Sequence, residues 1–310
     1  MKLDWSLRKI EEWRTHFAKV PRANHLQSMP FARALALTER KSSRFALIFD
    51  NENPIGMVAV HEFKVGPLHL VSLFRGPLWF CENPPDAWLA EFATLLNAEY
   101  PRRILRFRKW LPEWNNSDVA KRVLHAMGFK RKRETYETIW LDLRQSDAEL
   151  RSHMKPNWRN HLNKGERSNI RVSSDWTGKT GNLFLHKYEL DRKTRKYPGR
   201  SIKFLREEIC AALCFNEMFI MWAVKDEKTV AAILVFIHGK SASYRIGWTT
   251  PAGRECNAHN VLLWEAVKIL KDKGLTFFDL CGVEPATAEG VTAFKRGMGG
   301  EDYVSVGMFG

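Results

Sequence analysis

The side chains that could do chemistry do not form any of the common catalytic motifs. The chain contains no G-x-S-x-G elbow, no P-loop and no H-E-x-x-H pair, and its ten histidines lack the spacing of metal ligands. Its five cysteines are spread along the chain, and Cys210 and Cys214 stand four residues apart rather than in a C-x-x-C pair. We therefore expect no metal site and no disulfide, and we expect the cysteines to be buried free thiols.

Positive charge is the second chemical feature. The 310 residues include 49 Lys and Arg against 35 Asp and Glu, which gives a formal net charge of +14. The excess is concentrated in residues 151–206, with 15 basic and 4 acidic side chains, and in the run Lys130–Arg133. Localised cations bind phosphates in a salt-sensitive way that is independent of sequence. The pattern predicts an anionic ligand, and both RNA and a phosphorylated small molecule fit it.

The elements that must position these side chains occur twice in the same order. In the first half the patterns predict strands over 45–49, 55–61 and 68–74, a helix over 85–98, a strand over 104–107 and a helix over 117–127. The second half predicts strands over 219–224, 229–237 and 242–247, a helix over 260–271, a strand over 276–280 and a short helix near 298. Trp88 and Trp264 lie in equivalent helices and are assigned to the core. This is an internal repeat.

The repeated order predicts an α/β (α+β) fold with a mixed, twisted sheet flanked by helices in each copy. Ser146 and Glu149 have the form of a capping box that begins a helix, so we place the domain boundary near residue 143. The expected domains are 1–143 and 144–310. The strand-like segment 303–310 is expected to complete the sheet of either half.

The chain shows no membrane or secretion signal. No window holds about 18 uncharged apolar residues in a row. Charged residues follow Met1 where a signal peptide would have its apolar core. We expect no membrane span and a cytoplasmic location.

A series of segments carries a resemblance to a known family. The segments are His25–Ser28, Phe74–Trp79, Leu141–Leu143, Trp158–Lys164, Asn260–Glu265, Phe278–Leu280, and Phe294–Lys295 followed by Gly299 and Gly300. In order and spacing they resemble the Fem-type aminoacyltransferases, tandem acetyltransferase-like (GNAT) proteins that transfer amino acids from aminoacyl-tRNA to the peptidoglycan precursor. The resemblance covers nearly the whole chain. It implies an aminoacyltransferase that forms an amide bond, with aminoacyl-tRNA as co-substrate, an amine acceptor and no other cofactor.

The resemblance implies that Lys295 is the catalytic residue and that Phe294 helps to form the donor site. Aminoacyl transfer passes through a tetrahedral oxyanion, which a nearby cation stabilises. Without the resemblance, Lys295 would be interpreted as an exposed helix lysine beside Arg296. Asp279 ends a strand that looks buried, and it could act as a base, orient a polar neighbour or serve as a structural cap.

The acceptor positions implied by the resemblance are Arg75, Arg108, Arg200, Phe204 and Tyr244. Arg200 matches an arginine of the family's acceptor cleft, but other positions depart from the family pattern. Peptidoglycan-type members have a lysine near the position of Leu35, an Asp-Pro at Arg108-Lys109, and a tyrosine at Phe204. Reversing a charge at a ligand contact discriminates strongly between ligands. We expect the donor machinery to be kept, with a peptide, an amino sugar or a natural-product amine as acceptor in place of the nucleotide-linked pentapeptide.

Aminoacyl-tRNA would need a phosphate track, for which the basic segment supplies candidates. They are Lys155, Trp158, Arg159, Lys164, Arg167, Arg195 and Lys196. Among these, Trp158 is the candidate for stacking on a base.

Two other functions stay open. An acyl-CoA-dependent N-acyltransferase would normally have an Arg/Gln-x-x-Gly-x-Gly/Ala turn for the pyrophosphate, and neither copy contains one. A non-catalytic RNA-binding protein would also use the basic segment, but no RNP-type aromatic motif is present. The amino acid, the tRNA, the acceptor and the oligomeric state are left open by the sequence.

Overall fold

The computed structural model describes residues 1–7, 9–133, 135–283 and 289–310. The chain forms two compact units. One comprises Met1–Glu137 with Tyr303–Gly310, and the other comprises Thr138–Asp302. The division falls a few residues before the expected boundary near 143, because the strand that contains Thr138 pairs with the second sheet. The last eight residues belong to the first unit.

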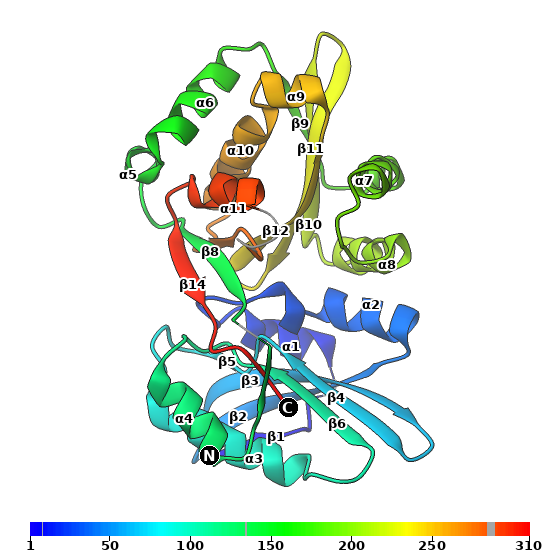
Figure 1. Cartoon of the computed structure of the whole chain (residues 1–310), viewed down its shortest axis with the longest axis vertical. Coiled ribbons are helices and arrows are strands. Elements are labelled where there is room, and N and C mark those ends of the chain that lie inside the picture. Colours follow the sequence, from blue (N-terminus) through cyan, green and yellow to red (C-terminus); the bar gives the residue numbers. More distant parts are fainter. Residues whose placement is uncertain (8, 134, 284–288) are drawn as a thin grey trace. The chain divides into compact units, whose positions relative to one another are not determined.

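The N-terminal unit is a mixed sheet with helices on both faces (Figure 1). Its strands run in the order β1-β2-β3-β4-β6-β15-β7, and β5 pairs with β3. Their bounds are β1 Lys2–Asp4, β2 Ser42–Asp50, β3 Asn53–Val65, β4 Leu68–Phe74, β5 Leu78–Trp79, β6 Arg106–Leu111, β7 Arg131–Arg133 and β15 Met308–Phe309. The helices are α1 Ile10–Phe17, α2 Met29–Glu39, α3 Asp86–Glu99 and α4 Asp118–Ala126, with a 3-10 turn over His25–Gln27.

The C-terminal unit repeats this plan, with its strands in the order β14-β8-β13-β12-β11-β10-β9. The strands are β8 Glu137–Asp142, β9 Arg171–Asp175, β10 Met218–Lys225, β11 Lys228–His238, β12 Ser241–Thr249, β13 Phe277–Asp279 and β14 Glu301–Val304. The helices are α5 Asp147–His153, α6 Pro156–Glu166, α7 Gly181–Arg195, α8 Ile202–Leu213, α9 Pro251–Glu255, α10 Ala258–Asp272 and α11 Glu289–Arg296. The expected capping box of Ser146 and Glu149 begins α5, which confirms that prediction.

The internal repeat is confirmed by the strand pairing. In each unit three antiparallel strands (β2-β3-β4 or β10-β11-β12) are followed by one parallel partner of the third, β6 or β13. A helix connects the two parallel strands, α3 in one unit and α10 in the other. Both sheets are mixed, as the sequence predicted.

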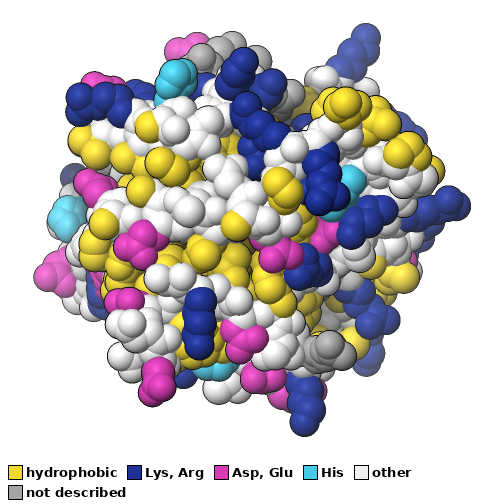
Figure 2. All heavy atoms as spheres, turned by 90° about the horizontal axis from the view of Figure 1, so that it is seen from below, with side chains coloured by type: hydrophobic (Ala, Val, Ile, Leu, Met, Phe, Trp, Pro, Cys, Tyr) yellow, Lys and Arg dark blue, Asp and Glu magenta, His cyan; other side chains and the backbone are white. Residues whose placement is uncertain are grey.

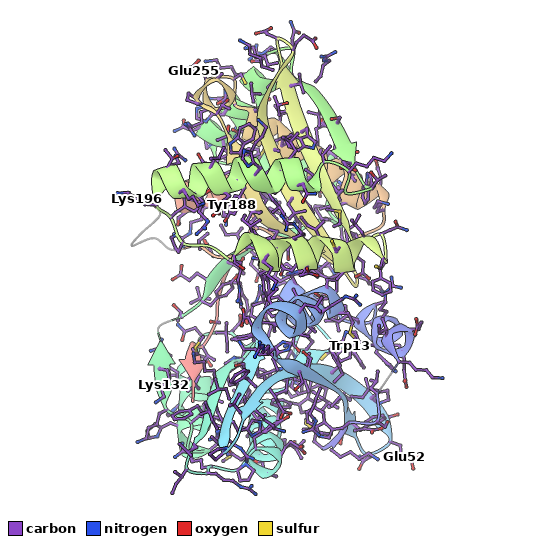
Figure 3. All side chains as sticks on the ribbon, turned by 90° about the vertical axis from the view of Figure 1, so that its right-hand side faces the viewer. Trp13, Glu52, Lys132, Tyr188, Lys196 and Glu255 are labelled. Carbon is purple, nitrogen blue, oxygen red and sulfur yellow. The ribbon has the colours of Figure 1, made fainter. Side chains whose placement is uncertain are left out.

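Alternation along the strands of the C-terminal unit creates two cores. Phe219, Met221 and Ile233 face one way and pack with α5, α6 and α10. The intervening residues, such as Ile220 and Leu234, face the other way and pack with α7 and α8. In Figure 3, α7 and α8 cross one face of this sheet.

One predicted strand is wrong at its start. Residues 104–107 were expected in a strand, whereas β6 begins at Arg106. Ile104 is 94% exposed, and Leu105 lies in the left-handed backbone region at φ 65°. The two apolar residues therefore form an exposed turn instead of entering the sheet.

Candidate active site

Lys295 is a buried lysine in the last turn of α11. Only 7% of it is exposed, so the interpretation as an exposed helix lysine is wrong. Its Nζ donates to the backbone carbonyls of Gly282 at 2.8 Å and Cys281 at 3.3 Å. Burial lowers the pKa of the Lys295 ammonium, and the neighbouring Cys281 and Asp279 act in the opposite direction.

Asp279 stabilises the backbone turn whose carbonyls accept hydrogen bonds from Lys295. It is fully buried at the end of β13, where its Oδ1 accepts the Cys281 N–H at 2.7 Å and the Thr138 hydroxyl. Cys281 has φ 59°, in the left-handed region that an L-residue adopts only when its surroundings stabilise it. The Asp279 carboxylate thus fixes the turn whose carbonyls point at Lys295. Of the three expected roles, the geometry fits orienting a polar neighbour.

Aromatic side chains lie around the Lys295 ammonium. The Lys295 Nζ lies 5.6 Å from the centroid of the Tyr244 ring, and the Tyr244 hydroxyl lies 3.4 Å from Nε2 of His259. The Phe294 ring lies 6.2 Å from that of His259, edge-on, and 5.9 Å from Trp158. Burial lowers the pKa of His259 to about 4, so its imidazole is neutral at pH 7. Burial also raises the pKa of the Tyr244 hydroxyl.

A β-bulge in β12 sets the direction of Tyr244. Val235 pairs with Tyr244 and Leu234 pairs with Ile246, which leaves Arg245 as the extra residue. Arg245 makes an ion pair at 3.1 Å with Glu208 of α8, which is fully buried. The bulge thus sends Arg245 toward α8 and leaves Tyr244 on the face of α10.

Gly247 leaves room for the Tyr244–His259 pair. A Cβ at this position would lie 2.3 Å from the Tyr244 hydroxyl and 2.5 Å from His259 Nε2. Replacing Gly247 by alanine is expected to displace both side-chain ends. We expect a loss of up to about 10²-fold in turnover, since small misplacements are costly, and about 1–3 kcal/mol in the free energy of unfolding.

The matched control for that prediction is Gly290→Ala in α11, where a Cβ would meet no atom within 4 Å. Turnover and urea unfolding are measured for both variants. A Gly247→Ala protein with parental turnover would mean that the Tyr244–His259 arrangement does not contribute to the reaction.

Glycines let α11 approach the start of α6 closely. A Cβ at Gly297 would lie 2.6 Å from Trp158 Cδ1, and one at Gly299 would lie 2.1 Å from the His153 carbonyl oxygen. The Lys155 N–H donates to the Gly297 carbonyl at 2.9 Å. Trp158 is only 4% exposed and belongs to the core, so its proposed role in stacking on a base is wrong.

Two expected acceptor residues lie in the N-terminal unit, and both are engaged there. Arg75 is buried in a bidentate ion pair with Glu113, with both distances 2.7 Å. Arg108 donates to Asn97 at 2.6 Å and lies over the Phe129 ring at 4.6 Å. Burial, with Arg102 and Arg106 nearby, lowers the pKa of Arg108.

The other acceptor candidates lie in the C-terminal unit. Arg200 stands over the ring of Phe204 at 4.5 Å, and Phe204 is buried at the start of α8. Of the five candidates, Tyr244 lies beside Lys295.

The basic segment divides between the two faces of the C-terminal sheet. Lys155, Arg159 and Lys164 lie at or in α6, and Arg167 follows it. Arg195 ends α7, and Lys196 follows on the opposite face (Figure 3). Some of this charge is compensated, as in the Arg195–Asp191 pair at 3.8 Å. The segment therefore does not form one continuous track on one face.

On the face of the molecule seen in Figure 2, Lys and Arg side chains are interspersed with acidic and apolar ones. The positive charge of that face is therefore not a single patch.

The cysteines differ from expectation in their exposure. Cys81, Cys210 and Cys214 are exposed, Cys256 is buried and Cys281 is intermediate, and all five are free thiols. Cys210 and Cys214 are exposed because α8 packs its Leu205 and Ile209 face on the sheet. Among the described residues, no group of three His, Cys, Asp or Glu side chains could hold a metal ion. In the same residues, no helix is long and apolar enough to cross a membrane.

The equivalent position in the first unit has no cation. Helices α4 and α11 occupy equivalent places, and when their first residues, Asp118 and Glu289, are matched, Lys295 corresponds to Leu124, which is fully buried in the core. The described arrangement of lysine, carbonyls and aromatic rings therefore belongs to the C-terminal unit.

Comparisons with known proteins agree with this picture. Residues 188–303 match the family model of the acetyltransferase (GNAT) domain. The structure of FemX superimposes with a TM-score of 0.80 at 14% identity, covering 100% of this chain and 96% of that one. No curated protein sequence matches the chain significantly.

Two further solved structures share the fold. The C-terminal domain of a putative lysylphosphatidylglycerol synthetase from Agrobacterium fabrum has a TM-score of 0.53 at 12% identity, covering 97% and 91% of the two chains. A tandem GNAT protein from the clavulanic acid biosynthesis pathway has a TM-score of 0.52 at 11% identity, covering 99% and 98%. The chain therefore has a tandem GNAT fold with the same plan as FemX, and its residues 188–303 match an acetyltransferase (GNAT) domain.

Proposed function

We propose that the chain transfers an aminoacyl group from aminoacyl-tRNA to an amine acceptor, with Lys295 as the catalytic residue. The observation that carries this proposal is the buried Lys295 ammonium. Hydrogen bonds to two backbone carbonyls fix its position beside the Tyr244 ring. A lysine is seldom buried without a task, because desolvating its charge is costly.

The reaction forms one bond and breaks another at the ester carbonyl carbon. The acceptor amine attacks this carbon, a C–N bond forms, and the carbonyl oxygen becomes an oxyanion. When the intermediate collapses, the C–O bond to the ribose breaks and the proton lost by the amine ends on the ribose oxygen. An ammonium has three N–H donors, and Lys295 uses two of them on Gly282 and Cys281. We assign the third to the oxyanion, where a preorganised donor in a low-dielectric site has its largest effect.

The donor assignment rests on the FemX-like fold and on the turn before α10. In the C-terminal unit this turn is replaced by the short helix α9, where the Thr250 hydroxyl already accepts the Gly253 N–H at 3.0 Å. Gly165 of α6 packs against the carbonyls of Cys256 and Asn257 at the end of the same turn. The N–H groups of Gly253, Arg254 and Cys256 thus already donate within this segment, which favours a donor without coenzyme A. The proposed reaction needs no other cofactor.

The candidate tRNA contacts are the exposed cations of α6 and α7. Lys155, Lys164 and Arg167 stand on the α6 side, and Lys196 stands on the α7 side. Because they lie on two faces, we propose that only one group binds the acceptor stem near Lys295. We favour the α6 group for this contact, because the backbone N–H of Lys155 donates to the carbonyl of Gly297, two residues after Lys295.

We propose that the acceptor is a peptide, an amino sugar or a natural-product amine. Leu35, at the position of the expected phosphate-binding lysine, is fully buried and offers no charge. Arg108, at the position of the expected aspartate, is held by Asn97 and the Tyr100 carbonyl. Calorimetric binding of a UDP-linked peptidoglycan precursor with the affinity of a substrate would contradict this part of the proposal.

Acetyl transfer from acetyl-CoA is the second candidate. It is favoured by the match of residues 188–303 to the acetyltransferase domain family. The two candidates are distinguished by incubating the chain with a cell extract and either mixed radiolabelled aminoacyl-tRNAs or radiolabelled acetyl-CoA. We expect label to leave the tRNA and appear in an amide. Label transfer from acetyl-CoA alone, with release of free coenzyme A, would replace this proposal with the second one.

A further inference from the structure

A group of exposed and partly exposed apolar side chains lies at one end of the N-terminal sheet. Across three paired strands, Phe63 of β3 faces Leu70 of β4, which faces Phe107 of β6. One step further along the β3–β4 hairpin, Val65 faces Leu68. Val65 is 57% exposed and Phe107 is 56% exposed. We call these five residues, together with Ile104 and Leu105, the apolar arm.

The strand residues of the apolar arm share one face of the sheet. Side chains two positions apart on a strand point the same way. Val71 and Leu73 of β4 pack in the core with α3 and α4, so Leu68 and Leu70 point to the other face. The same alternation separates Phe63 from Val60 on β3 and Phe107 from Trp110 on β6. Figure 1 shows this end of β4 and β6 extending past α3.

The exposed turn adds to this surface. The Leu105 carbonyl accepts the His69 N–H at 2.9 Å, which ties the turn to the end of β4. Leu105 itself has φ 65° and is 44% exposed, and the neighbouring Ile104 is 94% exposed. A bulky residue held in the left-handed region is uncommon, and here it keeps two large apolar side chains in solvent.

Cations surround the apolar arm. Residues 101–109 contain five basic side chains and no acidic one. Arg102, Arg103 and Lys109 are exposed, whereas Lys64 of β3 points to the other face and pairs with Glu62 at 2.7 Å. Exposed apolar side chains next to Arg and Lys favour binding to the surface of an anionic bilayer, because the apolar groups enter the interfacial layer and the cations attract the headgroups.

We propose that the apolar arm docks on a membrane surface that contains anionic lipids. Ile104, Leu105 and Phe107 enter the interfacial layer, while Arg102, Arg103 and Lys109 contact the phosphates of the headgroups. This surface belongs to the N-terminal unit and does not include Lys295, so the proposal does not depend on the identity of donor or acceptor.

The experiment is co-sedimentation of the full chain with vesicles. One set contains phosphatidylcholine and phosphatidylglycerol in about equal parts, and the other contains phosphatidylcholine alone. The first variant, Ile104→Ser with Phe107→Ser, removes apolar surface and keeps the charge. The second, Arg102→Glu with Arg103→Glu, does the reverse. The matched control is Leu190→Ser, an exposed leucine of α7 that is 54% exposed.

We expect the parent chain to bind the anionic vesicles and not the zwitterionic ones. Each double variant should lower the partition coefficient on the order of tenfold or more, and the control should leave it unchanged. Because every replaced side chain is exposed, the thermal midpoint should stay at the parental value in all variants.

Several results would overturn the proposal. One is binding by the Ile104→Ser, Phe107→Ser variant equal to that of the parent, which would mean that the net charge of +14 acts alone. Others are no binding of the parent to either vesicle, or concentration-dependent self-association without vesicles that the same variants abolish. The last result would assign the apolar arm to an interface with a second copy of this chain.

Discussion

Replacing Lys295 by alanine is expected to lower turnover by about 10²–10³-fold, with little change in the KM for the acceptor. Loss of one preorganised donor to an oxyanion has an effect of this size. The KM changes little because the assigned N–H acts on a charge that exists only in the transition state. Arginine at this position is also expected to be inactive. Its planar guanidinium cannot reproduce the point charge that donates to Gly282 and Cys281.

The control for Lys295 is Lys228→Ala, which removes an exposed lysine at the start of β11. Turnover is measured with the labelled donor that the parent uses, and tRNA binding is measured separately by filter retention. The Lys295→Ala chain should bind tRNA like the parent. Full activity of Lys295→Ala would contradict the catalytic assignment. If the parent also transferred no label while it bound tRNA, the non-catalytic RNA-binding function would be favoured.

The repeat and the mixed sheets could be predicted because they depend on local features of the sequence: apolar runs, turn residues and helix caps. Continuous apolar runs predict strands such as β10 and β11, and a capping box with Ser146 and Glu149 begins α5. The same logic failed at Ile104, where an apolar run looks like a strand but ends in a turn. Periodicity records which residues are apolar, and it does not record whether a surface covers them.

The neighbours of Lys295 could not be predicted in the same way. Its partners are backbone carbonyls, which every residue carries, and the Cys281 turn that aims them depends on Asp279 and on Thr138 from another strand. His259 was missed as well. The only available signal was its place one residue before the predicted helix over 260–271, after the Tyr244–Gly247 motif.

The basic segment shows a further limit of the linear sequence. A run of charge along the chain predicts a patch only if consecutive helices lie on one face. Here α6 and α7 are separated by β9 at the edge of the sheet, so their cations lie on opposite faces. Trp158 was misjudged for a similar reason. It lies between Lys155 and Arg159 in sequence, but its ring is buried and packs on Phe294, whereas Lys155 is exposed.

Asp279 is expected to act on the reaction through Lys295, and its two simplest variants should behave differently. Asparagine keeps an oxygen that can accept the Cys281 N–H, so the turn and most of the turnover should remain. Alanine removes the acceptor and frees the turn, and a loss of about 10²-fold is expected because the Lys295 ammonium is misplaced. It also leaves the Cys281 N–H and the buried Thr138 hydroxyl without this acceptor, which should lower the free energy of unfolding by about 1–3 kcal/mol.

The pH dependence of turnover distinguishes an effect of Asp279 on Lys295 from an effect of Asp279 on protein stability alone. In the proposed mechanism Lys295 acts as the protonated ammonium, so we expect turnover to fall as the pH rises through the pKa of Lys295. Burial lowers that pKa, and the negative charge of Asp279 opposes the shift. Neutralising the charge in Asp279→Asn therefore lowers the pKa further and moves the alkaline limb of the turnover profile to lower pH.

Thr138→Val is the matched variant, because it removes a partner of Asp279 and leaves the carboxylate in place. Its alkaline limb should stay near that of the parent even if its free energy of unfolding falls. An alkaline limb that stays in place in Asp279→Asn, or full turnover in Asp279→Ala, would show that the carboxylate serves only the stability of the β13 turn. A shift of the alkaline limb in Asp279→Asn but not in Thr138→Val would show that the charge of the buried Asp279 carboxylate raises the pKa of the Lys295 ammonium.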